Sequence, residues 1–164
     1  MFSRPAGVVG TAFRLTASAV CIRDDALLLV HWSPSVRQAL WTLPGGGLEH
    51  AEDPFDTVRR EVAEETGYTV EVERMLGVDS MRAKHRGTDW HWVRIVYQAT
   101  VVGGALRSEV GGSTDRAAWI PLDEVDGLPR NDLVDIGLRL NGGRPPTGHL
   151  FDATKSASAH QDNI

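Results

Sequence analysis

A helix with clearly marked ends, over residues 54–66, is the feature that most constrains the fold of this chain. Asp53 is a suitable N-cap, Pro54 suits the first helical position, and Gly67 suits the left-handed position that ends a helix. The loop before the helix, residues 41–48, contains one proline and three consecutive glycines, which exclude a regular helix or a central strand there. The backbone is therefore expected to turn sharply, or to lie close against another group, just before the helix begins.

Strand-forming sequences flank this loop and helix on both sides. Two apolar runs between residues 13 and 32 are separated by two neighbouring aspartates, which predicts a β-hairpin. A second strand pair is expected over residues 68–81 and 92–102. We expect a polar loop over residues 82–89 to join this second pair.

The C-terminal part of the chain is expected to hold a short strand over residues 117–120 and a last helix. Asn131 or Asp132 can cap this helix, which should end near Leu140. From Gly142 onward the sequence is rich in Gly, Pro, Ser and Ala, which is typical of a flexible tail. The length of 164 residues fits one globular domain. We therefore expect an N-terminal extension over residues 1–12, a domain over residues 13–141 and a flexible tail over residues 142–164.

Three glutamates, Glu61, Glu64 and Glu65, lie on one face of the predicted helix, because residues three and four apart are neighbours on an α-helix. Their mutual repulsion costs roughly 0.2–0.5 kcal/mol per pair on an isolated helix, which favours the presence of a compensating cation. One interpretation is a solvated helix face on which Arg59 and Arg60 neutralise the acids. The other interpretation is a metal site.

The glycine-rich loop favours the metal site. Such a turn can bring backbone oxygens close to a ligand, and Glu52 comes within reach of Arg60 once the loop folds back. Carboxylate and carbonyl oxygens, without Cys or paired His, favour Mg²⁺ or Mn²⁺ over zinc. Because Mg²⁺ usually takes its remaining ligands from substrate phosphates, the site predicts hydrolysis at phosphorus. The choice of general base stays open, since carboxylates this close titrate together.

The negative charge of the chain is concentrated at this site. The formal net charge is -5, and residues 49–65 hold seven acids and two bases, so the rest of the chain is balanced. No run of Lys or Arg is present, which argues against a nucleic-acid polymer as a partner. The apolar N-terminal stretch is too short and too often interrupted by arginine for a membrane span, and the single cysteine, Cys21, suits a reducing interior. We therefore expect a cytoplasmic protein with no membrane partner.

The spacing of these residues resembles the Nudix box over positions 46–68. The matching residues are Gly46, Glu52, Arg60, Glu61, Val62, Glu64, Glu65 and Gly67. Tyr68 replaces the usual aliphatic residue at the end of the motif, a change that should affect packing more than chemistry. The resemblance implies an α/β fold, namely the Nudix α/β/α sandwich with a mixed, partly barrel-like sheet.

The resemblance also implies the roles of the site residues. Glu61, Glu64 and Glu65 would bind Mg²⁺ or Mn²⁺ with help from the carbonyl of Gly45 or Gly46. Arg60 and Glu52 would orient these carboxylates, since metal-bound carboxylates need partners for their other lone pairs. Many Nudix proteins take a further acid from a loop outside the box, and Glu109 and Asp115 lie in the suitable region, with Glu109 preferred.

A Nudix hydrolase cleaves the pyrophosphate bond of a nucleoside diphosphate linked to another moiety, so the resemblance implies a metal-dependent pyrophosphohydrolase acting on a small nucleotide. The alternative is a nucleotide-sensing module that has the same fold and little turnover. Such modules tend to lose acids of the box or to gain a DNA-binding domain, and this chain does neither.

The residues that bind the substrate are less clearly marked. Trp90 and Trp92 lie beside the expected polar loop, where they could stack on a nucleobase or pack in a homodimer. Trp41 and Trp119 occupy positions that favour the core. Arg37 is a candidate for contacts with substrate phosphates.

The choice of substrate stays open. Ala83 and Lys84 stand where ADP-ribose pyrophosphatases of the family have a proline. The remaining candidates are nucleoside triphosphates, oxidised ones included, and nucleotide sugars. A homodimer through the strands over residues 68–81 and 92–102 also stays open, because an amphipathic strand looks the same on its own core or on a neighbour.

Overall fold

The structure, a computed structural model, describes residues 10–34 and 38–151. Within these ranges it contains strands, two α-helices and one short 3-10 helix. In chain order the elements are β1 (Gly10–Val20), β2 (Ile22–Arg23), β3 (Ala26–Trp32), β4 (Leu40–Thr42), β5 (Gly45–Gly47), α1 (Pro54–Thr66), β6 (Tyr68–His85), β7 (Thr88–Gly104), β8 (Thr114–Pro121), η1 (Val125–Gly127) and α2 (Asp132–Gly143).

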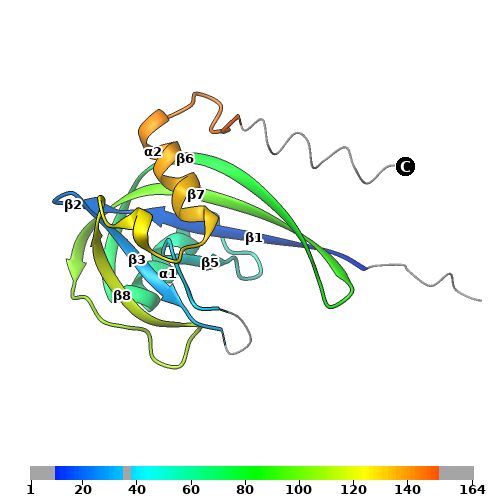
Figure 1. Ribbon diagram of the computed structural model, residues 1–164, viewed down its shortest axis with the longest axis horizontal. Helices are drawn as coiled ribbons and strands as arrows, with labels where there is room; N and C mark the ends of the chain where they lie inside the picture. The colour runs from blue at the N-terminus through cyan, green and yellow to red at the C-terminus, as the bar shows by residue number, and fades with distance from the viewer. Residues whose placement is uncertain (1–9, 35–37, 152–164) are drawn as a thin grey trace, which may run out of the picture.

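The strands form two sheets, which Figure 1 shows with a long curved hairpin extending past the helices. In the first sheet the order is β5-β1-β7-β6, with β1 parallel to β7 and the other pairs antiparallel. In the second sheet β3 pairs with β2, β4 and β8, always antiparallel. The presence of both pairing types confirms the expected mixed sheet.

The two helices pack against opposite sides of the strands. Leu28 of β3 belongs to the buried apolar cluster that contains Val58 and Val62 of α1. Its neighbours Leu27 and Leu29 belong instead to the cluster that contains the apolar residues of α2. Successive side chains of a strand point to opposite faces, so β3 contributes to both clusters. The α/β/α sandwich is therefore confirmed.

The helix α1 begins and ends where the sequence predicts. The Asp53 carboxylate accepts a hydrogen bond of 2.8 Å from the Phe55 amide, and Pro54 opens the first turn. Gly67 adopts φ 77°, and its amide donates to the carbonyl of Ala63. These local signals fix the position of the helix face that carries the three glutamates.

The first predicted hairpin is only partly correct. Asp24 and Asp25 form a tight turn with φ values of 50° and 58°, and this turn joins the short strand β2 to β3. The longer strand β1 does not pair with β3, because it runs between β5 and β7 in the other sheet. The chain passes from one sheet to the other at Cys21, between β1 and β2.

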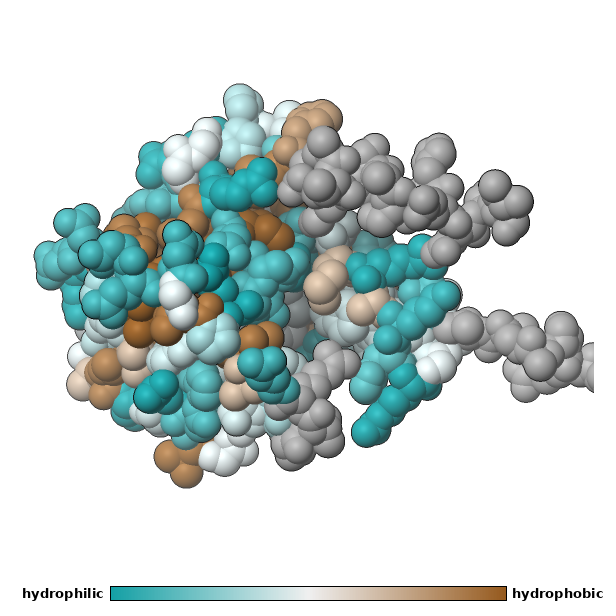
Figure 2. All heavy atoms as spheres, viewed as in Figure 1, coloured by the Kyte–Doolittle hydropathy of each residue, from teal (hydrophilic) through white to brown (hydrophobic). Residues whose placement is uncertain are grey.

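The predicted polar loop over residues 82–89 is wrong, because β6 and β7 continue through it. The turn itself is confined to Arg86 and Gly87, which have positive φ values of 50° and 76°. Near the end of the hairpin, Nε of Arg82 donates to both carboxylate oxygens of Asp89 at 3.0 Å. Figure 2 shows hydrophilic side chains covering this end, which explains why the sequence looks like a loop although its backbone is paired.

The glycine-rich segment forms β5, a short strand at the edge of the first sheet. Its three glycines pair with Thr16, Ala17 and Ser18 of β1. A Cβ on Gly45, which has φ 154°, would lie 2.3 Å from the Ala17 carbonyl oxygen. The backbone therefore lies close against β1, as the glycines indicate, and it occupies an edge rather than the centre of the sheet.

Tyr68, the one departure from the box motif, is a core residue that is 8% exposed. Its hydroxyl accepts a hydrogen bond of 3.1 Å from Nε1 of Trp119, which packs against the same cluster. Trp41 is also in the core, at 5% exposure. The core positions expected for Trp41 and Trp119 agree with this packing.

Both expected domain boundaries lie inside regular elements, since β1 begins at Gly10 and α2 ends at Gly143. The Asn131 side chain caps α2 by accepting from the Leu133 amide at 2.9 Å. After α2, the Gly148 carbonyl accepts a hydrogen bond of 2.9 Å from the Val78 amide. Residues 1–9 and 152–164, which include most of the expected extension and tail, lie outside the described residues.

No helix among the described residues is long and apolar enough to cross a membrane.

Candidate active site

The glycine-rich strand β5 and the helix α1 meet at Glu65. This side chain is buried, with the residue 5% exposed, and one carboxylate oxygen accepts a hydrogen bond of 2.9 Å from the Gly45 amide. Beside it, a Cβ on Gly46 would lie only 2.4 Å from a carboxylate oxygen of Glu61. The absence of a side chain at Gly46 thus allows the Glu61 carboxylate to lie directly against the backbone of β5.

Arg60 links the loop before the helix to the acids on the helix. Its Nε and one terminal nitrogen donate to the two carboxylate oxygens of Glu52, at 2.8 and 2.9 Å. Its other terminal nitrogen donates to Glu61 at 3.0 Å and to Glu64 at 3.3 Å. A further contact of 3.3 Å reaches the Gly47 carbonyl. The expected pairing of Arg60 with Glu52 is therefore present, and the same guanidinium orients two of the three helix acids.

The environments of the acids separate their pKa values. Hydrogen bonds from the Arg60 side chain and the Glu49 amide lower the pKa of Glu52 to about 2. Burial raises the pKa of Glu65 to about 8, and the neighbouring acids Glu61, Glu109 and Glu64 add to this rise. Burial also raises the pKa of Glu61, against the opposing effect of Arg60. The site therefore holds acids that a bound cation would stabilise in their charged form.

The chemistry of these groups fits a hard divalent cation, although the acids do not surround one common point. Within residues 10–34 and 38–151, no three His, Cys, Asp or Glu side chains lie close enough together to hold a metal ion. Glu64 is half exposed and turned toward Arg60, while Glu65 is held by Gly45. Oxygen donors from carboxylates and from a glycine-rich backbone are nevertheless the set that Mg²⁺ and Mn²⁺ prefer.

The two acids considered from outside the box lie in different places. Glu109 lies on the loop between β7 and β8, near enough to raise the pKa values of Glu61 and Glu65. Its carboxylate accepts hydrogen bonds from the amide and the hydroxyl of Thr114, at 3.2 and 2.8 Å. Asp115 instead contacts Nδ1 of His31 at 2.7 Å. The preference for Glu109 over Asp115 is therefore consistent with the structure, and its role at a metal stays a prediction.

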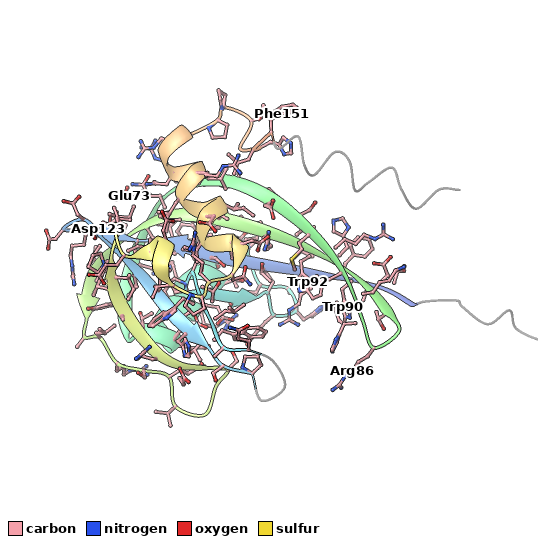
Figure 3. All side chains as sticks on the ribbon, viewed as in Figure 1. Glu73, Arg86, Trp90, Trp92, Asp123 and Phe151 are labelled. Atoms are coloured by element: carbon pink, nitrogen blue, oxygen red, sulfur yellow. The ribbon has the colours of Figure 1, made fainter. Side chains whose placement is uncertain are left out.

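A cavity of about 840 Å³ opens beside the glycine-rich strand. Glu65 and all three glycines of β5 line one part of it, and the two candidate tryptophans Trp90 and Trp92 line another. The rings of Trp90 and Trp92 stack on each other, with centroids 5.5 Å apart and planes 28° from parallel. Figure 3 shows both on the stretch of β7 that leads from the turn at Arg86. Arg37, the third candidate for substrate binding, lies outside the described residues.

Three lining residues were not singled out from the sequence. Trp32 lies at the end of β3, Arg14 on β1, and Arg94 on β7. The Arg94 guanidinium is buried and forms ion pairs with Asp79 and Asp132, so it ties β7 to β6 and to α2. The sequence contains one signal for Arg94. It follows Trp90 and Trp92 at a spacing of two, and residues two apart on a strand lie on the same face of the sheet.

The predicted role of Arg60 in orienting metal ligands can be tested by exchanging it for lysine. This variant is expected to lower kcat/KM by about 10- to 100-fold, the usual loss when such an orienting group is removed. Lysine keeps the charge but cannot contact both oxygens of Glu52 and still reach Glu61. Steady-state kinetics over a Mg²⁺ titration would measure the loss. Arg59→Lys on the exposed side of the same helix is the matched control and should retain activity. Equal activity of both variants would contradict the positioning role of Arg60.

The chain is similar to one protein family over most of its length, since the family model of the NUDIX domain matches residues 12–137. A MutT-like protein of Streptomyces ambofaciens is 34% identical over 114 residues, which are 68% of this chain and 66% of that protein. The ADP-ribose pyrophosphatase of Methanocaldococcus jannaschii is 31% identical over 106 residues, which are 65% of this chain and 60% of that protein. The chain thus spans less than two thirds of the length of these curated relatives.

The fold is also similar to solved structures. A NUDIX hydrolase from Nitrosomonas europaea superposes with a TM-score of 0.71 and 27% sequence identity. The superposition covers 80% of this chain and 90% of that one.

Proposed function

Because the chain belongs to the Nudix family, we propose that it is a divalent-metal-dependent hydrolase that cleaves the phosphoanhydride bond of a nucleoside diphosphate linked to another group. The observation that carries the proposal is the position of Glu65. This buried acid, with its raised pKa, lies against the glycine-rich strand and lines the cavity. Burying a carboxylate beside other acids is costly unless a cation compensates it, so the arrangement supports a metal-binding role.

Glu61, Glu64 and Glu65 would hold the Mg²⁺ or Mn²⁺ ion, with a carbonyl of Gly45 or Gly46. When bound, such an ion neutralises charge on a substrate phosphate and lowers the pKa of a coordinated water. The residues of the chain have separate tasks. Arg60 and Glu52 would keep the helix acids in place, and the missing side chain of Gly46 leaves room for the Glu61 carboxylate against β5.

ADP-ribose is the first substrate to test, because a relative from Methanocaldococcus jannaschii is named as an ADP-ribose pyrophosphatase. Ala83 and Lys84 in place of the proline of that subgroup argue against ADP-ribose, so other nucleotide sugars are tested beside it. ADP-ribose belongs to the nucleotide sugars, one of the two classes that the sequence leaves open. Nucleoside triphosphates form the second class, which the similarity to a MutT-like protein supports. The cavity of about 840 Å³ is within the usual range for pockets that enclose small-molecule ligands.

Removal of the metal is expected to abolish hydrolysis. Purified protein treated with EDTA should release no phosphate-containing product from any nucleotide in a panel of nucleotide sugars and triphosphates. Excess Mg²⁺ or Mn²⁺ should restore activity on at least one of them, because the acids of the site need a cation to approach an anionic substrate. Product analysis by ion-exchange chromatography would identify the bond that is cleaved.

Two outcomes would decide against the proposal. Hydrolysis that continues without metal would contradict the role of the glutamates. Tight binding of a nucleotide with no hydrolysis in either metal would instead support the alternative of a sensing module.

A further inference from the structure

A positively charged side chain in the cavity, Arg14, has no partner among the described residues. Arg14 lies on β1 and lines the cavity, while no hydrogen bond or ion pair to its guanidinium exists within residues 10–34 and 38–151. The second arginine of the cavity, Arg94, is neutralised by Asp79 and Asp132. Of the two arginines among the described lining residues, Arg14 is therefore the one whose guanidinium is available to an anionic ligand.

The position of Arg14 connects it to the candidate metal site. A Cβ on Gly47 would lie 2.6 Å from a terminal nitrogen of Arg14 and 3.0 Å from its central carbon. The guanidinium thus packs against the last glycine of β5, and the Gly47 carbonyl is itself in contact with Arg60. A phosphate near β5 would lie within reach of Arg14, which offers several donors in one plane.

The register of the sheet places an aromatic ring next to this cation. Arg14 and Trp92 are direct partners in the parallel pairing of β1 with β7, so their side chains share one face. The alternate residues confirm the assignment of faces, since Phe13 and His91 are also partners and their rings meet 5.3 Å apart. The stacked rings of Trp92 and Trp90 extend the same face toward the hairpin turn.

We propose that Arg14 and Trp92 form a substrate-recognition surface in which Arg14 binds a phosphate and Trp92 stacks on the base of a nucleoside diphosphate. The inference rests on the proposed function and specifies the orientation of its substrate. The phosphates lie toward β5, and the planar ring lies along the Trp92 and Trp90 side of the cavity. An aromatic ring accepts any base through its π-face, so this surface selects for a ring rather than for one base.

The test compares two ligands that differ by the nucleoside, ADP and inorganic pyrophosphate. Their binding is measured by calorimetry in Mg²⁺, in a Glu64→Gln background that prevents turnover. Arg14→Ala should weaken both ligands by about tenfold, the loss that accompanies one hydrogen bond to a charged group. Trp92→Ala should weaken ADP by about tenfold and leave pyrophosphate within about twofold, because only ADP has a base to stack.

Matched variants test whether these effects are specific to the surface. Phe13→Ala changes an aromatic residue of β1 on the face opposite to Arg14, and Arg59→Ala removes a cation outside the cavity. Both variants should bind ADP and pyrophosphate as tightly as the Glu64→Gln protein does. Trp92→Phe should keep most of the ADP affinity, and Arg14→Lys should keep part of both affinities. In the protein with Glu64 intact, Arg14→Ala and Trp92→Ala should raise KM more than they lower kcat.

The outcomes separate the two proposals. Two results would overturn the recognition surface alone. The first is metal-dependent hydrolysis of a nucleotide that Arg14→Ala does not affect. The second is an equal loss of affinity for ADP and for pyrophosphate in Trp92→Ala. Absence of both hydrolysis and ADP binding in the unaltered protein would overturn the proposed function together with this surface.

Discussion

A Glu64→Gln variant is expected to lose about a thousandfold or more in kcat while it stays as stable as the parent. The Glu64 side chain is half exposed, and within residues 10–34 and 38–151 it accepts one hydrogen bond, of 3.3 Å, from Arg60. Glutamine keeps the size of the side chain and its ability to accept that bond. A large loss of activity can therefore come only from the missing charge, which removes several kcal/mol of stabilisation in a metal-assisted reaction.

Kinetics and urea denaturation would be measured together on this variant. Asp56→Asn on the same helix removes one exposed carboxylate outside the site. It should leave kcat unchanged and alter the free energy of unfolding by no more than about 0.5 kcal/mol. If Glu64→Gln kept more than about a tenth of the parent kcat, Glu64 would not be a metal ligand or base. A loss of stability equal to the loss of activity would point to a structural role instead.

The helix that carries these acids could be predicted to the residue, because its signals are local. Asp53, Pro54 and Gly67 set its ends through their own backbone preferences, whatever the rest of the chain does. The pairing of Arg60 with Glu52 was predictable for the same reason, since a short loop leaves few places for it to fold back. The part of the site that lies within the motif was therefore predictable, because it depends on residues that are close together in the sequence.

The partners of β1 and the cavity wall depend on contacts between distant segments. β1 pairs with β7 instead of with β3, and a pattern of alternating apolar residues contains no information about which neighbour it will meet. Arg14 therefore looked like one of several arginines near the N-terminus, although the register places it beside Trp92. The end of the β6–β7 hairpin was missed because its outer residues are mostly exposed, so apolar alternation is weak there.

The Glu65→Gln variant is expected to be inactive and, without metal, more stable than the parent. Burial raises the pKa of Glu65 to about 8, above the ordinary value near 4.5 that it has in the unfolded chain. The folded state then holds the proton more tightly than the unfolded state does. As the pH rises from about 4.5 to about 8, the unfolded chain loses this proton first, so ionisation of Glu65 progressively destabilises the metal-free fold.

Glutamine removes this penalty and can still accept the hydrogen bond from the Gly45 amide. In EDTA at pH 8 the variant should be roughly 2 to 4 kcal/mol more stable than the parent, and the difference should vanish near pH 4.5. Added Mg²⁺ should stabilise the parent by mass action and leave the variant unchanged, because the charged oxygen is gone. Urea denaturation at both pH values, with and without Mg²⁺, tests all three expectations. A variant less stable than the parent at pH 8 in EDTA would show that Glu65 supports the fold, and that its burial is not a cost maintained for binding a cation.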